Sequence, residues 1–177
     1  SERPGELRRI VVAVDPPASS RRTSDACGII AAGMGNDGRA VVLADATLNA
    51  ARPQDWATRA VSLYHALAAD CLLVEVNQGG EMASAVIRTV DASVPVKPVR
   101  AQRGKWLRAE PVAALYQADR VRHAGRFPEL EDEMCDFGPH GLSSGRSPDR
   151  VDALVWALSE LLLNGRDAEP RIRDFGI

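Results

Sequence analysis

Apolar runs separated by turn residues divide the first part of the chain into short predicted strands. The runs lie at residues 9–14, 27–34 and 39–48. Short apolar runs bounded by turn signals are typical of buried strands. The sequence GNDG at residues 35–38 joins the second run to the third, and its residues tolerate positive φ. We therefore predict three consecutive strands that include a hairpin.

Helical and extended segments alternate in the middle of the chain. Apolar positions at residues 54–69 recur with helical spacing, which predicts an amphipathic helix. The run CLLVEV at residues 71–76 is short and strongly apolar, so we predict a central strand, followed by a helix at residues 81–90. Residues 94–99 are extended, and their two prolines favour an edge strand.

The last third of the chain repeats this alternation and ends on a long helix. We predict in order a helix, a short strand, an acidic helix, a flexible loop and a final helix, at residues 106–118, 120–124, 128–137, 138–148 and 148–165. Pro111 lies near the start of the first of these helices or marks a break in it. One face of the final helix carries apolar residues at Val151, Leu154, Val155, Leu158 and Leu162.

This element order predicts one α/β domain spanning residues 1–177, with an ordered core at about residues 8–164. Three strands followed by alternating helices and strands indicate an antiparallel meander joined to parallel crossover units. The predicted sheet is therefore mixed, with three antiparallel strands plus parallel crossover strands, and is flanked by helices. This is the element order of the ribonuclease H-like fold.

Composition excludes several classes of protein. Hydrophobic residues make up 45% and charged residues 26%, which is the balance of a soluble globular protein. No apolar run approaches the roughly 20 residues that a bilayer span needs, so we predict no membrane association. No signal peptide is visible, and the three cysteines are widely spaced without a CxxC motif. These features predict a reducing compartment, the cytoplasm.

Charge is unevenly distributed along a chain whose net charge is only −2. Residues 97–109 hold five cations and no acid, whereas residues 129–136 hold five acids and no cation. A basic stretch on a neutral protein can bind a polyanion locally, or it can simply be a solvated face.

Three carboxylates from distant parts of the chain are candidates for one site. Asp15 ends the first predicted strand, Glu75 interrupts the apolar run LLVEV, and Asp152 lies one turn into the final helix. Asp15 and Glu75 lie side by side if the first and fourth strands are neighbours, and the final helix can bring Asp152 over them. Asp149 is a fourth candidate. Each acid also has an ordinary explanation, because Asp15 can stabilise a turn and acids favour a helix N-terminus.

An oxygen-only ligand set of this kind predicts a site for hard divalent cations, Mg²⁺ or Mn²⁺. Two such ions can activate a water molecule and stabilise the leaving oxygen of a phosphodiester, so the acids need not be nucleophiles. Which acid holds which ion stays open. Lys105 and Arg108 are candidates to neutralise the phosphate or to hold the DNA backbone, or else they are exposed helix charges.

Four segments carry a resemblance to a known family. The motifs VDPP, VEVNQGG, KWLRA and SPDRVDALVWAL occur in this order and resemble the C-terminal nuclease domain of the large terminase subunit of tailed bacteriophages, prophages and gene transfer agents. The resemblance covers residues from about 9 to 162. It implies a ribonuclease H-like nuclease that uses two divalent metals, Mg²⁺ or Mn²⁺, to cut concatemeric double-stranded DNA during genome packaging.

The resemblance also implies roles for individual residues. The metal-binding and catalytic acids are Asp15, Glu75 and Asp152, with Asp149 as a further ligand and Asp25 as a peripheral acid. Asn77 and the pair Gly79 and Gly80 match the supporting turn of the family. The implied DNA-binding residues are Lys105, Arg108, Arg103 and Arg100. The loop at residues 138–147 is a candidate for gating DNA access, or an ordinary mobile loop.

The resemblance implies partners beyond DNA. Full-length proteins of that family carry an N-terminal packaging ATPase, and this chain contains no GxxxxGK[ST] motif, so we expect the ATPase outside these residues. Portal and small terminase subunit are further expected partners. Two alternatives stay open: a Holliday-junction resolvase, and a non-catalytic module of the same fold that binds DNA or docks on the portal.

Overall fold

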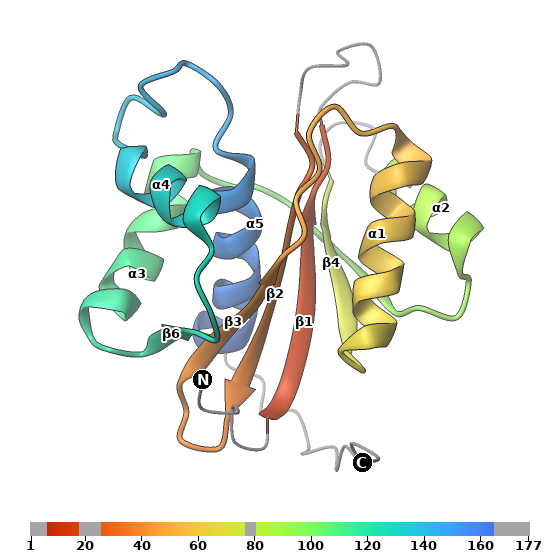
Figure 1. Cartoon of the computed structure of the whole chain (residues 1–177), viewed down its shortest axis with the longest axis horizontal. Coiled ribbons are helices and arrows are strands. Elements are labelled where there is room, and N and C mark those ends of the chain that lie inside the picture. Colours follow the sequence, from red (N-terminus) through yellow and green to blue (C-terminus); the bar gives the residue numbers. More distant parts are fainter. Residues whose placement is uncertain (1–6, 18–25, 77–80, 165–177) are drawn as a thin grey trace.

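The computed structural model describes residues 7–17, 26–76 and 81–164, and these form a sheet between two layers of helices (Figure 1). The strands in chain order are β1 (Leu7–Asp15), β2 (Gly28–Gly35), β3 (Ala40–Asp45), β4 (Cys71–Glu75), β5 (Val96–Val99) and β6 (Val121–His123). The helices are α1 (Pro53–Ala66), α2 (Glu81–Val90), α3 (Lys105–Gln117), α4 (Pro128–Asp136) and α5 (Asp149–Leu158), and α5 continues into the π-helix η1 (Ser159–Leu163).

The sheet has the strand order β5-β4-β1-β2-β3-β6. The first three strands pair antiparallel, whereas β4, β5 and β6 each pair parallel with their neighbour. The predicted meander with parallel crossover strands is confirmed, and so is the edge position of the proline-containing strand β5. The tight turn between β2 and β3 has Gly38 at φ 76°, the positive value that its sequence predicts.

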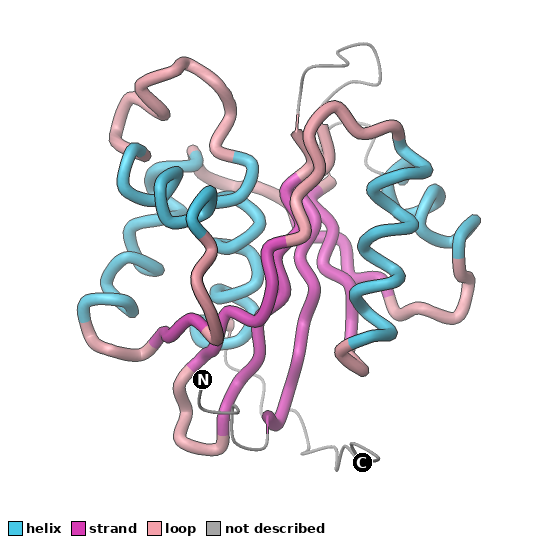
Figure 2. The backbone as a smooth tube through the Cα atoms, in the orientation of Figure 1, coloured by secondary structure: helices cyan, strands magenta, loops and turns pink. Residues whose placement is uncertain are grey.

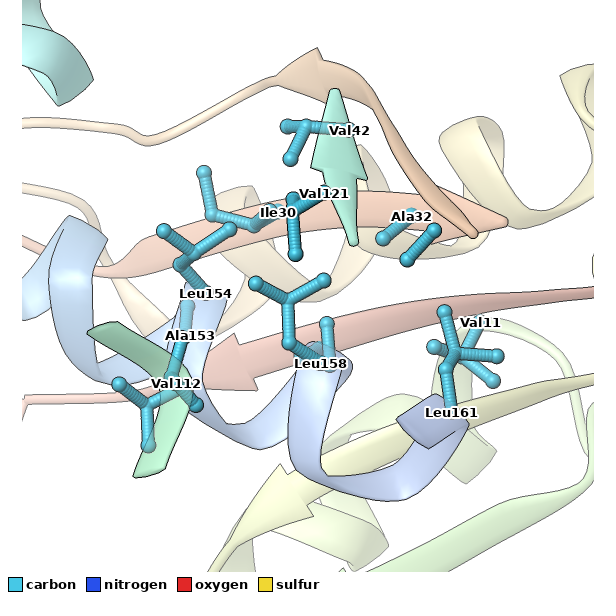
Figure 3. Packing of buried hydrophobic residues seen from close by; sticks show 14 of the residues in the cluster. Val11, Ile30, Ala32, Val42, Val112, Val121, Ala153, Leu154, Leu158 and Leu161 are labelled. Carbon is cyan, nitrogen blue, oxygen red and sulfur yellow. The ribbon is translucent and has the colours of Figure 1, made fainter. Parts of the chain in front are cut away.

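The strands form one layer with helices on both sides of it (Figure 2). Alternation along β1 and β4 assigns their side chains to two cores, one on each side of the sheet. Val11, Ala13 and Leu73 face the layer of α3, α4 and α5, whereas Val12 and Leu72 face α1 and α2. Figure 3 shows how α5 fills the first of these cores with Leu154 and Leu158 against Ile30 of β2 and Val121 of β6. Burying a side chain of this size contributes roughly 1.5–3 kcal/mol, so α5 is firmly fixed on the sheet.

Two helices differ in detail from the sequence prediction. The final helix changes to a π-turn after Leu158, where Leu161 is buried and the predicted Leu162 is partly buried against the same core. Helix α3 runs through Pro111 without a break. Among the described residues, no helix is long and apolar enough to span a membrane.

A candidate nuclease active site

Asp15 and Glu75 lie side by side where two central strands end. Strands β1 and β4 are parallel, and Val14 pairs with Val74 immediately before the two acids. Alternation of side chains places both acids on the α5 face, two residues beyond Ala13 and Leu73. Both side chains are buried. The apolar strands β1 and β4 therefore deliver two carboxylates to one edge of the core.

Helix α5 adds two further acids over the same strand ends. Asp149 and Asp152 occupy its first turn, and Asp152 is almost fully buried. Gly28, which pairs with Asp15 across the sheet, allows this approach. A Cβ atom on Gly28 would lie 1.9 Å from the carbonyl oxygen of Asp149, so only glycine fits under the helix start. We refer to Asp15, Glu75, Asp149 and Asp152 as the acidic cluster.

Ion pairs from neighbouring elements hold the start of α5 in place. Arg150 donates from Nε to Asp45 Oδ2 at 3.0 Å and from Nη2 to Glu129 Oε2 at 2.6 Å. The backbone N–H of Val151 donates to Glu133 Oε1 at 2.8 Å. The acidic helix α4 thus serves to position α5, because its carboxylates compensate the charge of Arg150 and bind a free N–H of the first turn.

Two cations from the start of α3 contact the acidic cluster. Lys105 Nζ donates to Asp152 Oδ2 and, at 2.8 Å, to Ser147 Oγ. Arg108 Nη2 donates to Asp152 Oδ1 at 3.3 Å, and its Nη1 lies 3.8 Å from Glu75 Oε2. The ion pairs of these two cations therefore reach two of the buried carboxylates, Asp152 and Glu75.

Trp156 of α5 contacts both the Glu75 carboxylate and the Arg108 guanidinium. Its indole Nε1 donates to Glu75 Oε2 at 2.7 Å, and its ring lies 4.6 Å from the Arg108 guanidinium carbon. A charge-assisted hydrogen bond and a cation–π contact act through the same ring. Trp156 thus fixes Glu75 and Arg108 relative to each other.

The acids carry more negative charge than their surroundings compensate. Burial raises the pKa of Asp15 well above its ordinary value, and the nearby charges of Asp152 and Glu75 raise it further. Burial also raises the pKa of Asp152, although Lys105 acts in the opposite direction. Burial and uncompensated charge of this kind are typical of functional carboxylates. The arrangement favours binding of additional positive charge.

Chemistry and present geometry differ in how well the cluster fits a metal ion. Its donors are carboxylate oxygens only, which suits Mg²⁺ or Mn²⁺. Among the described residues, however, no three Asp, Glu, His or Cys side chains are grouped as a ready metal cage. Lys105 and Arg108 contact the carboxylate oxygens instead. Metal binding therefore requires the acids to exchange at least one of these contacts for the ion.

The remaining predicted residues lie elsewhere. Arg100 and Arg103 are exposed on the segment that leads from β5 to α3, outside the acidic cluster. Asp25, Asn77, Gly79 and Gly80 are outside the described residues.

Lys97, which belongs to the same basic stretch, lies in a different cluster. Its Nζ donates to Glu160 Oε2 at 2.7 Å, and Arg9 Nη2 donates to Glu160 Oε1 at 2.7 Å. Glu160 is buried in η1, and these contacts lower its pKa against the effect of burial, which is the largest single influence. We refer to Glu160, Arg9 and Lys97 as the Glu160 cluster.

Sequence reasoning assigned no role to Gly28, Ser147 or Trp156. Gly28 carries a signal, because a glycine at the start of an apolar strand indicates close approach of another backbone. Trp156 has a weaker one, an aromatic residue with an N–H donor beside the apolar positions of the final helix. Ser147 has none, since its role depends on where α3 packs.

The sequence as a whole matches one protein family. The match is to the terminase RNaseH-like domain and covers residues 12–161. The chain therefore belongs to the family of terminase RNaseH-like domains, and its fold and family are those of a nuclease. Comparison with curated proteins gives no match.

Solved structures share the fold at low sequence identity. The large terminase nuclease from thermophilic phage G20c has a TM-score of 0.67 and 15% identity, over 89% of this chain and 84% of that one. The human cytomegalovirus terminase nuclease domain has a TM-score of 0.62 and 14% identity, over 89% and 85%. Thermus thermophilus RuvC has a TM-score of 0.53 and 17% identity, over 92% of this chain and 99% of that one.

These likenesses confirm the predicted ribonuclease H-like fold. The phage G20c nuclease also matches in structures with bound magnesium, zinc and cobalt.

Proposed function

We propose that this domain is a divalent-metal-dependent endonuclease that cuts concatemeric double-stranded DNA during genome packaging, with Asp15, Glu75 and Asp152 as its catalytic residues. The observation that carries the proposal is the convergence of three buried carboxylates from β1, β4 and α5, whose ion pairs among the described residues come from two cations only. A structural role alone does not account for it, because uncompensated buried charge destabilises a fold.

The acidic cluster is proposed to hold two ions, Mg²⁺ or Mn²⁺, through Asp15, Glu75 and Asp152, with Asp149 as a further ligand. When bound, such ions supply Lewis acidity that activates water and stabilises the charge that develops on a phosphodiester. The carboxylates remain ligands rather than nucleophiles. Their burial keeps competing water away and strengthens each electrostatic contact. The metal-bound forms of the phage G20c nuclease support a divalent ion at this fold.

Cations around the cluster are proposed to bind the DNA backbone. Lys105 and Arg108 lie close enough to the acids to donate to the oxygens of the phosphate that is cut. Arg100 and Arg103 are exposed on the adjoining segment, where they extend this positive surface toward neighbouring phosphates. Phosphate contacts of this kind position DNA without reading its sequence.

Family membership supports the setting of this activity. We propose that the domain works with an N-terminal ATPase domain of the same full-length protein, with the portal and with the small terminase subunit, in the cytoplasm of a bacterial host. DNA positioning is then shared with these partners. The isolated domain is therefore expected to cut slowly and with little sequence preference.

Plasmid cleavage with a matched control tests the proposal. We expect the chain to nick and linearise supercoiled plasmid in the presence of Mn²⁺, and Asp15→Asn to lower the rate by at least about 100-fold. Glu160→Gln removes a buried carboxylate outside the acidic cluster and should leave the intrinsic rate within a few fold. Equal rates for wild type and Asp15→Asn, or no cleavage by either, would contradict the catalytic proposal.

The resolvase alternative rests on the fold shared with Thermus thermophilus RuvC and a yeast mitochondrial Holliday junction resolvase. Their TM-scores of 0.53 and 0.55 are lower than the 0.67 of the phage terminase nuclease. Four-way junctions and linear duplexes of the same sequence separate the two functions. A strong preference for the junction would favour the resolvase, and binding to either DNA without cutting would favour a non-catalytic module.

A further inference from the structure

Lys105 lies within the acidic cluster rather than at its border. Its ammonium donates to Asp152 Oδ2 and also interacts electrostatically with Asp15 and Asp149. A second hydrogen bond, to Ser147 Oγ at 2.8 Å, ties it to the loop before α5. One ammonium therefore interacts electrostatically with three of the four acids, as a bound metal cation would.

Arg108 differs from Lys105 in how firmly it is held. The Arg108 side chain is 10% exposed and lies against the Trp156 ring, 4.6 Å from its centroid. The Lys105 side chain is 41% exposed and has a flexible stem without an aromatic neighbour among the described contacts. Lys105 can therefore move its charge into solvent by rotating its side chain, whereas Arg108 is a fixed part of the site.

We propose that the Lys105 ammonium is an internal competitor for divalent cations: it occupies the acidic cluster, and metal ions bind only when it leaves. The reason is that an ammonium on Asp152 both takes up a ligand oxygen and repels a second cation nearby. The two cations at the start of α3 thus have different roles, with Arg108 as a permanent partner and Lys105 as a replaceable one. This inference rests on the proposed metal site.

Displacement also links the metal site to the DNA. The released ammonium lies at the mouth of the cluster, beside the surface proposed to bind phosphates, and a phosphate oxygen is its natural next partner. DNA therefore stabilises the state in which Lys105 has left the acids. Metal ions and DNA are expected to favour each other's binding for this reason.

Calorimetric titration with Mn²⁺ tests the inference without relying on activity. Lys105→Met removes the ammonium and keeps the length of the side chain, so Mn²⁺ should bind about tenfold more tightly than to wild type. Lys97→Met is the matched control, because Lys97 is 44% exposed and also pairs with a buried carboxylate, Glu160. Its Mn²⁺ affinity should equal that of wild type.

Two more variants test whether the tighter Mn²⁺ binding comes from losing the Lys105 contact and whether it occurs at the acidic cluster. Ser147→Ala removes only the second contact of Lys105, so it should tighten Mn²⁺ binding in the same direction by a smaller factor, even if Lys105→Met folds poorly. Asp15→Asn combined with Lys105→Met should abolish the tight binding, which locates it at the acidic cluster. Retention of tight binding in this double variant would overturn the inference.

The remaining outcomes separate this inference from the proposed function. If wild type binds Mn²⁺ and Lys105→Met binds it equally or more weakly, Lys105 is not a competitor, and the metal site itself stands. If neither wild type nor Lys105→Met binds Mn²⁺, both the inference and the proposed metal-dependent function fail.

Discussion

Buried carboxylates lie at both ends of the continuous helix formed by α5 and η1, and folding shifts their pKa values in opposite directions. In η1, Glu160 is held by Arg9 and Lys97, and its pKa is lowered. At the beginning of α5, Asp15 and Asp152 have raised pKa values, because burial and neighbouring acids outweigh the available cations.

The balance of charge separates a structural cluster from one that is prepared for a ligand. A carboxylate with two cations is already satisfied, and an added ion gains nothing there. Three buried carboxylates with two cations favour further positive charge. Burial of the carboxylates alone does not separate the clusters, since Glu160 is as well buried as the acids of the candidate site.

The largest expected effect comes from Gly28→Ala, which disturbs one cluster only. The new Cβ would overlap the backbone of Asp149, so the start of α5 must move away from β2. We expect the free energy of unfolding to fall by about 3 kcal/mol, as for strongly overpacked sites. Urea unfolding measures this loss, and Mn²⁺ binding should weaken with it.

Gly104→Ala is the control for Gly28→Ala, because nothing lies within 4 Å of a Cβ atom at Gly104. Its free energy of unfolding should stay within about 0.5 kcal/mol of wild type. A loss at Gly28 no greater than at Gly104 would show that α5 does not depend on this close contact.

A smaller effect is expected from Glu160→Gln, which breaks the satisfied cluster. The change leaves Arg9 and Lys97 without their carboxylate partner, although both cations reach solvent. We expect a loss of about 2 kcal/mol in the free energy of unfolding, less than for a fully buried pair. Urea unfolding at neutral pH measures it. Unchanged stability would mean that the Glu160 cluster contributes little to the fold.

In the absence of metal, Asp15→Asn is expected to increase the free energy of unfolding rather than to lower it. Since folding raises the pKa of Asp15 above its ordinary 3.8, its contribution to stability is present below that pH and is lost as pH rises through the folded value. Removing the charge should therefore increase the free energy of unfolding near pH 7 by about 1 kcal/mol.

The pH dependence separates Asp15 from Glu160. The gain from Asp15→Asn should shrink as pH falls toward 4. Glu160 behaves conversely, because its lowered pKa gives stability that is present above its ordinary 4.5 and is lost as pH falls through the folded value. Urea unfolding across this pH range measures both. A destabilised Asp15→Asn protein at neutral pH would show that Asp15 is structural.

Sequence reasoning predicted the fold and the neighbouring position of Asp15 and Glu75 because both follow from local pattern. Each acid directly follows an apolar strand, and parallel strands end at the same sheet edge. It could not distinguish Lys97 from Lys105, since both belong to one basic stretch. Register decides that difference: Lys97 pairs with Leu73 on an edge strand and reaches Glu160, whereas Lys105 begins a helix packed on α5.

The smallest expected effect comes from Trp156→Phe, which keeps an aromatic ring and removes the indole N–H. Glu75 loses the hydrogen bond of 2.7 Å, and Arg108 loses part of its cation–π contact. Because the carboxylates themselves remain, we expect Mn²⁺ affinity to fall only about threefold, as for the net loss of one weak hydrogen bond.

The Glu160 cluster serves as the internal reference for this last prediction. It has no contact with Trp156 among the described interactions, so the pH dependence of unfolding that Glu160 causes should be unchanged in Trp156→Phe. Calorimetry with Mn²⁺ and urea unfolding measure the two clusters separately. If Mn²⁺ affinity also stays unchanged, the indole is only a packing residue, and Glu75 is oriented by Arg108 and the strand rather than by α5.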